Sequence, residues 1–242
     1  MFRTVRHWWS EGSGQHTARL FAFELTVVIL GVLIAQGLAN WAGQRQQDAG
    51  VAKEAARLRF ETGRARNAAQ VWQAAIPCLR ARVDQLLHAA TAGTLEPPLT
   101  VRDLAMPKVG TYSVEPFNAD VERAFRDRYG DTVDDIYGGI MNNGATIKSM
   151  PQELSAAWSA FGYLAPDMGA PGPADRAAMR AAGLRLRWLL DRMAMLQGRI
   201  EGDARKLGIV PLGSGNALSI PDVPVTSCAE IWRHGHIWHA VP

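Results

Sequence analysis

Three histidines near the C-terminus form the group of side chains best suited to chemistry. His234, His236 and His239 follow one another closely, with Trp232 and Trp238 on either side. Two imidazoles on one face of a strand, or at helical spacing, can bind a transition metal together with a third nearby ligand. No acidic residue is clearly paired with these histidines. They therefore support an alternative prediction, a periplasmic metal-dependent enzyme, and not the main one.

The two cysteines form a second pair with chemical potential. Cys78 and Cys228 are far apart in the sequence, which is typical of a single structural disulfide in an oxidising compartment. Two unrelated buried thiols are the alternative. Two long helices are predicted below, one ending at residue 92 and one at residues 173–208. If they pack antiparallel, Leu207 lies level with about Arg57, roughly 30 Å from Cys78. About twenty extended residues reach up to ~66 Å, so the bond is sterically possible.

Other reactive patterns have simpler explanations. Ser214 lies between two glycines, but a nucleophile elbow needs a preceding strand and a following helix, which the local composition does not predict. The mixed charges of residues 120–135 indicate solvated ion pairs. Tyr112, Trp158 and Tyr163 could line a groove, although core packing is the default. No phosphate-binding loop or dinucleotide motif is present, and we expect no cofactor.

One long apolar stretch determines where these side chains are located. The sequence LFAFELTVVILGVLIAQGLANW, from Leu20 to Trp41, has about the 20 residues that a helix needs to cross ~30 Å of hydrocarbon. Aromatic residues lie near both of its ends, where they favour the headgroup region. We predict a single transmembrane helix at residues 20–42. A signal peptide cleaved near Gly37-Leu38-Ala39 is the alternative.

Small residues recur every four positions in this segment and predict self-association. They place a narrow stripe on one helix face where two backbones can approach closely, and two polar residues beside it can bond to a neighbouring helix. The predicted association residues are Gly31, Ala35, Ala39 and Gly43, with Gln36 and Asn40. We therefore expect membrane lipid as one partner and a homo-oligomer formed through the span.

Charge and cysteine usage together predict the orientation. Basic residues have a similar density on both sides of the span, so the positive-inside rule barely discriminates. A disulfide requires the oxidising side, which places residues 1–19 in the cytoplasm and the body in the periplasm. After the span the chain has 23 basic and 21 acidic residues, a balance that gives no electrostatic signal for nucleic acid.

The rest of the chain is predicted to be mainly α, with the transmembrane helix continuing into a helical stalk and an irregular α-helical bundle. A heptad seam from Ala55 to Ala90 predicts the first long helix, and near-heptad apolar spacing from Met179 to Leu207 predicts a second, antiparallel to it. Asn142-Asn143-Gly144 predicts a helix end, and Ser149 a new N-cap. The expected organisation is a cytoplasmic tail at 1–19, a transmembrane helix at 20–42, a stalk and first long bundle helix at 43–92, short helices and loops at 93–172, a second long bundle helix at 173–208, and an extended C-terminal tail at 209–242.

Two stretches carry a family resemblance. GVLIAQGLANWAGQR at the end of the span and MNNGATIKSMPQELSAAWSAF in the body are similar to segments of an uncharacterised family of single-span inner-membrane proteins of Gram-negative bacteria. The resemblance implies an anchored helical extracytoplasmic domain, and it supplies no assigned activity or catalytic residues. Together these patterns predict a membrane-anchored helical interaction, sensor or scaffold protein, non-enzymatic, that acts with an unknown envelope protein partner.

Overall fold

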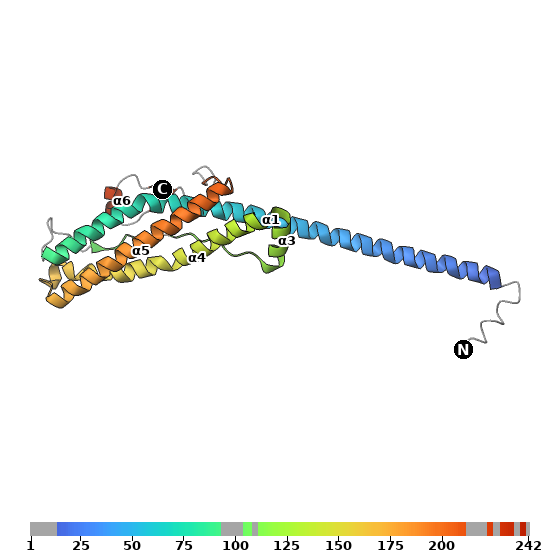
Figure 1. Cartoon of the computed structure of the whole chain (residues 1–242), viewed down its shortest axis with the longest axis horizontal. Coiled ribbons are helices and arrows are strands. Elements are labelled where there is room, and N and C mark those ends of the chain that lie inside the picture. Colours follow the sequence, from blue (N-terminus) through green and yellow to red (C-terminus); the bar gives the residue numbers. More distant parts are fainter. Residues whose placement is uncertain are drawn as a thin grey trace. The chain divides into compact units, whose positions relative to one another are not determined.

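The computed structural model describes residues 14–92, 104–107, 111–211, 222–224, 228–234 and 238–240. The chain divides into two compact units, residues 1–52 and 53–242. The described part is dominated by helices, in the order shown in Figure 1. The mainly α fold predicted from the sequence is therefore confirmed.

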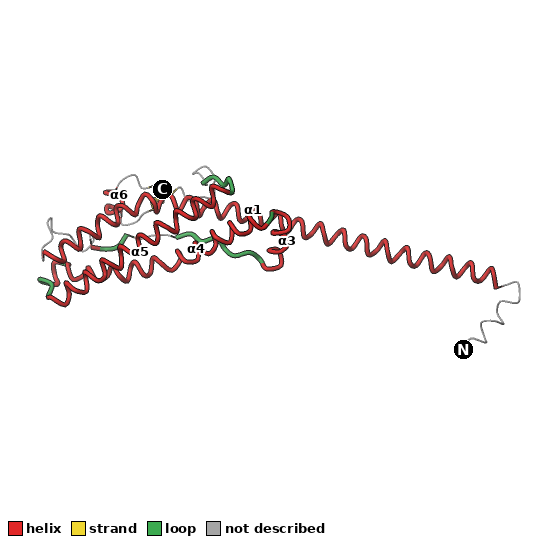
Figure 2. The backbone as a smooth tube through the Cα atoms, in the orientation of Figure 1, coloured by secondary structure: helices red, strands yellow, loops and turns green. Residues whose placement is uncertain are grey.

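Helix α1, Gly14–Ala92, is the longest element and runs through both units (Figure 2). In the second unit its heptad seam is buried at every predicted position: Ala55, Leu58, Thr62, Ala65, Ala69, Trp72, Ile76, Leu79, Val83, Leu86 and Ala90. From Ala55 onward the predicted helical stalk is therefore part of the bundle, because the chain's own helices cover its seam. The helix continues through Pro77, whose side chain faces solvent.

Helix α5, Pro173–Lys206, packs antiparallel to α1 as predicted. Arg187 pairs with Asp84 at 2.6 Å, and Arg80 pairs with Asp191. At Gly183 the two helices approach so closely that an added Cβ would overlap the Leu87 side chain. Glycine at this position therefore allows a tight helix contact.

The ends of α5 follow its capping residues. Pro173 occupies the first turn, where its missing N–H costs nothing, and the Asp175 carboxylate accepts a hydrogen bond from the Gly172 N–H at 2.8 Å. At the other end Gly208 has a φ of 66°, and the Ile209 N–H donates to the Ala204 carbonyl at 3.0 Å. A positive φ at the glycine with this bond is the geometry of a Schellman motif. The predicted end of the second long helix near residue 208 is confirmed.

Helices α3, Ala119–Tyr129, and α4, Asp131–Trp158, correct the prediction of short helices in this segment, since α4 is long and continuous. The expected break at Asn142-Asn143-Gly144 is absent. Gly144 instead allows a close contact within the continuous helix, since a Cβ added there would lie 3.2 Å from the Ser113 Cα. Ser149 is not an N-cap, since its hydroxyl donates to the Thr146 carbonyl at 3.1 Å inside the continuous helix. Gly144 therefore marks a close backbone contact and not a helix end.

Short elements complete the second unit. Two 3-10 helices, η1 Ser159–Leu164 and η2 Pro166–Met168, lead from α4 to α5. The expected extended tail instead contains α6, Cys228–His234, and an antiparallel pair of strands, β1 Asp222–Pro224 and β2 Trp238–Ala240. Backbone bonding within these elements satisfies groups that an isolated extended tail would leave to water.

Candidate functional site

The N-terminal part of α1 has the properties of a membrane span. It contains an 18-residue window with a mean hydropathy of 2.2, of which no part is buried. All described side chains from residue 18 to 49 are exposed. Burial of large apolar side chains is the normal result of folding in water, so a long fully exposed apolar stretch is suited to another apolar environment. This is one helix long and apolar enough to span a membrane.

The predicted association residues share one exposed surface of this segment. Gly31, Ala35, Ala39 and Gly43 follow one another at four-residue spacing on α1, and Gln36 and Asn40 lie beside them. An added Cβ at Gly31 or Gly43 would meet no atom within 4 Å, so the backbone is open to close approach there. The Thr26 hydroxyl, by contrast, is satisfied within the helix by the Ala22 carbonyl at 2.7 Å. Self-association through the stripe stays a prediction.

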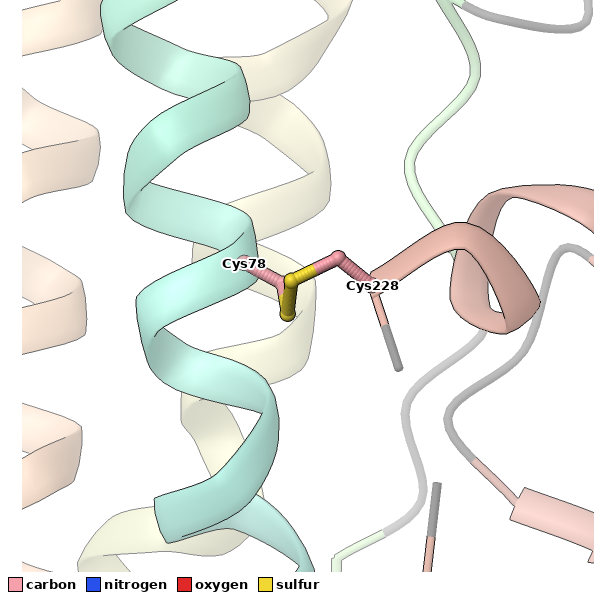
Figure 3. The surroundings of a disulfide bond; sticks show 2 residues. All are labelled: Cys78 and Cys228. Atoms are coloured by element: carbon pink, nitrogen blue, oxygen red, sulfur yellow. A yellow bond between two sulfur atoms is a disulfide. The ribbon is translucent and has the colours of Figure 1, made fainter. Parts of the chain in front are cut away.

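The two cysteines meet where α6 contacts α1. Figure 3 shows Cys78 on α1 joined to Cys228 at the first position of α6; the Cα atoms are 5.3 Å apart and the sequence separation is 150. Cys78 is buried whereas Cys228 is exposed. The pairing is the one that the sequence predicted, and it attaches the start of α6 to the C-terminal part of α1.

A cluster of side chains supports the disulfide. Ile231 is fully buried, and the Trp232 ring stacks on Trp158 of α4 with centroids 6.2 Å apart. The Arg82 guanidinium lies 4.5 Å from the centre of the Trp232 ring, and the Trp158 Nε1–H donates to the Leu104 carbonyl at 2.8 Å. Helix α6 is therefore held by packing as well as by the covalent bond. In the sequence Trp232 is notable only as a neighbour of the histidines, and no pattern there predicts this packing role.

The structure describes two of the three predicted metal ligands. His234 is the last residue of α6, His239 lies in β2, and His236 lies outside the described residues. Within the described parts of the chain, no three potential ligands are grouped closely enough to hold a metal ion.

An open acidic hollow of about 410 Å³ lies between the loop at Phe117 and the first turns of α4. Asp134, Asp135 and Glu122 line it, together with Gly138 and Gly139. Arg126 partly neutralises it, since its guanidinium is 2.8 Å from Asp134 and 3.2 Å from Glu122. The predicted ion pairs of this segment are thus present, although Asp134 is buried and not solvated as expected.

A polar cluster links α1 to the C-terminal end of α5. The Arg66 guanidinium pairs with the Glu201 carboxylate at 2.8 Å, and Arg205 adds a second contact to Glu201 at 3.1 Å. Arg66 also donates to the Ile209 carbonyl just beyond the helix. Burial would by itself raise the pKa of Glu201, but the hydrogen bonds from Arg66 and Arg205 outweigh it and hold this pKa below its usual value.

Glu201→Gln should therefore destabilise the protein in a pH-dependent way. Because the pKa is lower in the folded state, the carboxylate stabilises the fold above its ordinary pKa near 4.5, and this contribution is lost as the pH falls through the folded value. At neutral pH we expect a loss of about 2 kcal/mol, typical of hydrogen bonds to charged groups. Urea unfolding of the full chain in detergent, followed from neutral to acidic pH, measures it.

Glu153→Gln is the matched control. Glu153 pairs with Arg185 at 2.6 Å, but both side chains are about half exposed, so we expect a change below about 0.5 kcal/mol. A destabilisation by Glu201→Gln that is the same at every pH would contradict the assigned role of the charged carboxylate.

No family model, curated protein or solved structure matches this chain. The family resemblance of the two sequence segments stays a prediction.

Proposed function

We propose that this protein is a single-pass membrane protein whose helical domain binds other proteins, as an interaction, sensor or scaffold module without catalytic activity. The observation that carries the proposal is the exposed apolar segment of α1, continuous in the same helix with residues that form a bundle core. A helix built in this way has one part suited to lipid and another suited to protein packing.

The disulfide supports an orientation. Disulfides persist in oxidising compartments and are rare where thiols are kept reduced. We therefore assign residues 1–19 to the cytoplasm and the bundle to the periplasm, with the span in the inner membrane of a Gram-negative bacterium. In a reducing compartment the Cys78–Cys228 bond would not persist, and it could not constrain the long loop that it closes.

Self-association through the span forms part of the proposal. The stripe from Gly31 to Gly43 has no side chain that would hold two backbones apart, and Gln36 can hydrogen-bond across a helix pair. Association at the span would leave the faces of the bundle available to an envelope protein partner.

Alkaline carbonate extraction of membranes tests the anchoring. An integral protein stays in the membrane pellet, whereas a protein bound only at the surface is released. We expect the full chain in the pellet, detected with an epitope tag at the N-terminus. Release into the supernatant, or loss of the N-terminal tag by cleavage, would contradict an anchored protein.

A further inference from the structure

Helix α5 has apolar side chains on the side opposite its core face. Leu184, Trp188 and Met195 are 63%, 45% and 48% exposed, although the buried face of the same helix already supplies its core contacts. Arg187 on one flank pairs with Asp84 of α1, and Arg185 on the other pairs with Glu153 of α4. On the surface of α5 the apolar side chains therefore lie between the flank that contacts α1 and the flank that contacts α4, and they face outward. We call them the α5 outer stripe.

The outer stripe has the spacing of a coiled-coil seam. Extended toward the N-terminus it includes Ala177 and Ala181, and the steps between successive positions alternate regularly between four and three residues. Asp191 occupies the one polar position, where it pairs with Arg80. A narrow stripe with this spacing is what a partner helix contacts, whereas a lipid surface requires a broader apolar face.

Arginines occupy most positions that flank the stripe. In heptad notation Arg185, Arg192 and Arg199 are at e, and Arg180 and Arg187 are at g. Within the described part of the chain, Arg180, Arg192 and Arg199 have no acidic partner. Residues at e and g determine which partner a seam accepts.

These charges exclude a second copy of α5 as a favourable partner. In a parallel pair, Arg180 would face Arg185 of the other copy and Arg187 would face Arg192, and an antiparallel pair would also bring arginines together. Like charges at these positions are repulsive. The complementary surface is a helix with Glu or Asp at its own e and g positions.

Trp188 is a suitable anchor for such a contact. Two guanidinium groups lie near its ring, with Arg185 at 4.5 Å and Arg192 at 5.2 Å from the ring centre, and the side chain nevertheless stays 45% exposed. Trp and Arg are the residues that dominate binding energy at interfaces.

We infer that the α5 outer stripe binds an amphipathic helix with acidic flanks, supplied by another protein. This inference rests on the proposed interaction function and specifies the chemistry of its partner. The stripe contributes the apolar seam, and the arginines select the acidic helix.

A pair of synthetic heptad peptides tests the inference with the full chain in nanodiscs of zwitterionic lipid. Both peptides have Leu at a and d; one has Glu at e and g, and the other has Lys. Fluorescence anisotropy should show saturable, salt-sensitive binding of the Glu peptide only. Trp188→Ala should weaken this binding about 30-fold, as expected for a central interface tryptophan. Arg192→Glu should also weaken binding of the Glu peptide, because it places like charges opposite each other at one flanking position.

Met168→Ala is the matched control, because Met168 is 57% exposed but lies in η2, outside the stripe. Its peptide binding should equal that of the wild type. A photo-crosslinking residue at position 184 should form an adduct with the Glu peptide. An adduct with a second copy or with lipid would overturn the inference, as would equal binding of the two peptides or no binding at all.

The outcomes separate this inference from the proposed function. Carbonate extraction does not depend on the outer stripe. An anchored chain that fails to bind the Glu peptide therefore overturns only the inference, whereas a chain released by carbonate overturns the anchoring itself.

Discussion

The double variant Leu30→Arg/Leu33→Arg should lose its attachment to the membrane. Both leucines lie in the middle of the exposed apolar segment, at 52% and 57% exposure. Near the centre of a span, replacing Leu by Arg costs about 3 to 4 kcal/mol of insertion free energy. Two such changes should cost about 7 kcal/mol, enough to move the N-terminally tagged protein from the carbonate-resistant pellet to the supernatant.

The matched control places the same charges at the ends of the span. In Leu20→Arg/Gln44→Arg the long side chains reach the headgroup region, where a guanidinium is easily accommodated. This variant should stay in the pellet. Retention of the central variant as well would show that residues 20–42 do not anchor the protein.

Removal of the disulfide should cause the largest loss of stability in the bundle. The bond between Cys78 and Cys228 closes a loop of 150 residues. In the chain-entropy model such a loop is worth about 5 kcal/mol, and loss of native disulfides typically costs 2 to 5 kcal/mol. For Cys78→Ser/Cys228→Ser we expect a fall of about 2 to 5 kcal/mol in the free energy of unfolding, measured by urea titration in detergent.

Reductant provides the control for this experiment. It should destabilise the wild-type protein by the same amount and leave the double serine variant unchanged. If the variant and the oxidised wild type unfolded at the same urea concentration, the bond would not contribute to the stability of the fold.

The sequence predicted best those features that depend on regular burial. The seam of α1 and the core face of α5 repeat at fixed spacing, and helices with such faces must pack together to remove them from water. The same argument predicted the antiparallel pairing, from which the reach between Cys78 and Cys228 followed. The stop at Gly208 was predictable because only a residue that tolerates positive φ ends a helix in this way.

Features that depend on a specific neighbour were not predictable. Gly144 resembles a helix terminator, and only the Ser113 backbone against it shows that it is a contact residue. Asp134 resembles a solvated residue, and only the fold buries it beside Arg126. The outer stripe is not predictable from the sequence, because an apolar residue on a helix is assigned to the core until the structure shows which face is already covered.

Thiol labelling in cells tests the central claim most directly. The full chain is expressed in a Gram-negative bacterium, the outer membrane is permeabilised, and a membrane-impermeant maleimide is added before or after an impermeant phosphine reductant. With the proposed periplasmic bundle and paired cysteines, we expect labelling only after reduction, and chiefly at Cys228, which is exposed whereas Cys78 is buried. Labelling that needs lysis but no reductant would place the bundle in the cytoplasm with free thiols, and would contradict both the orientation and the disulfide.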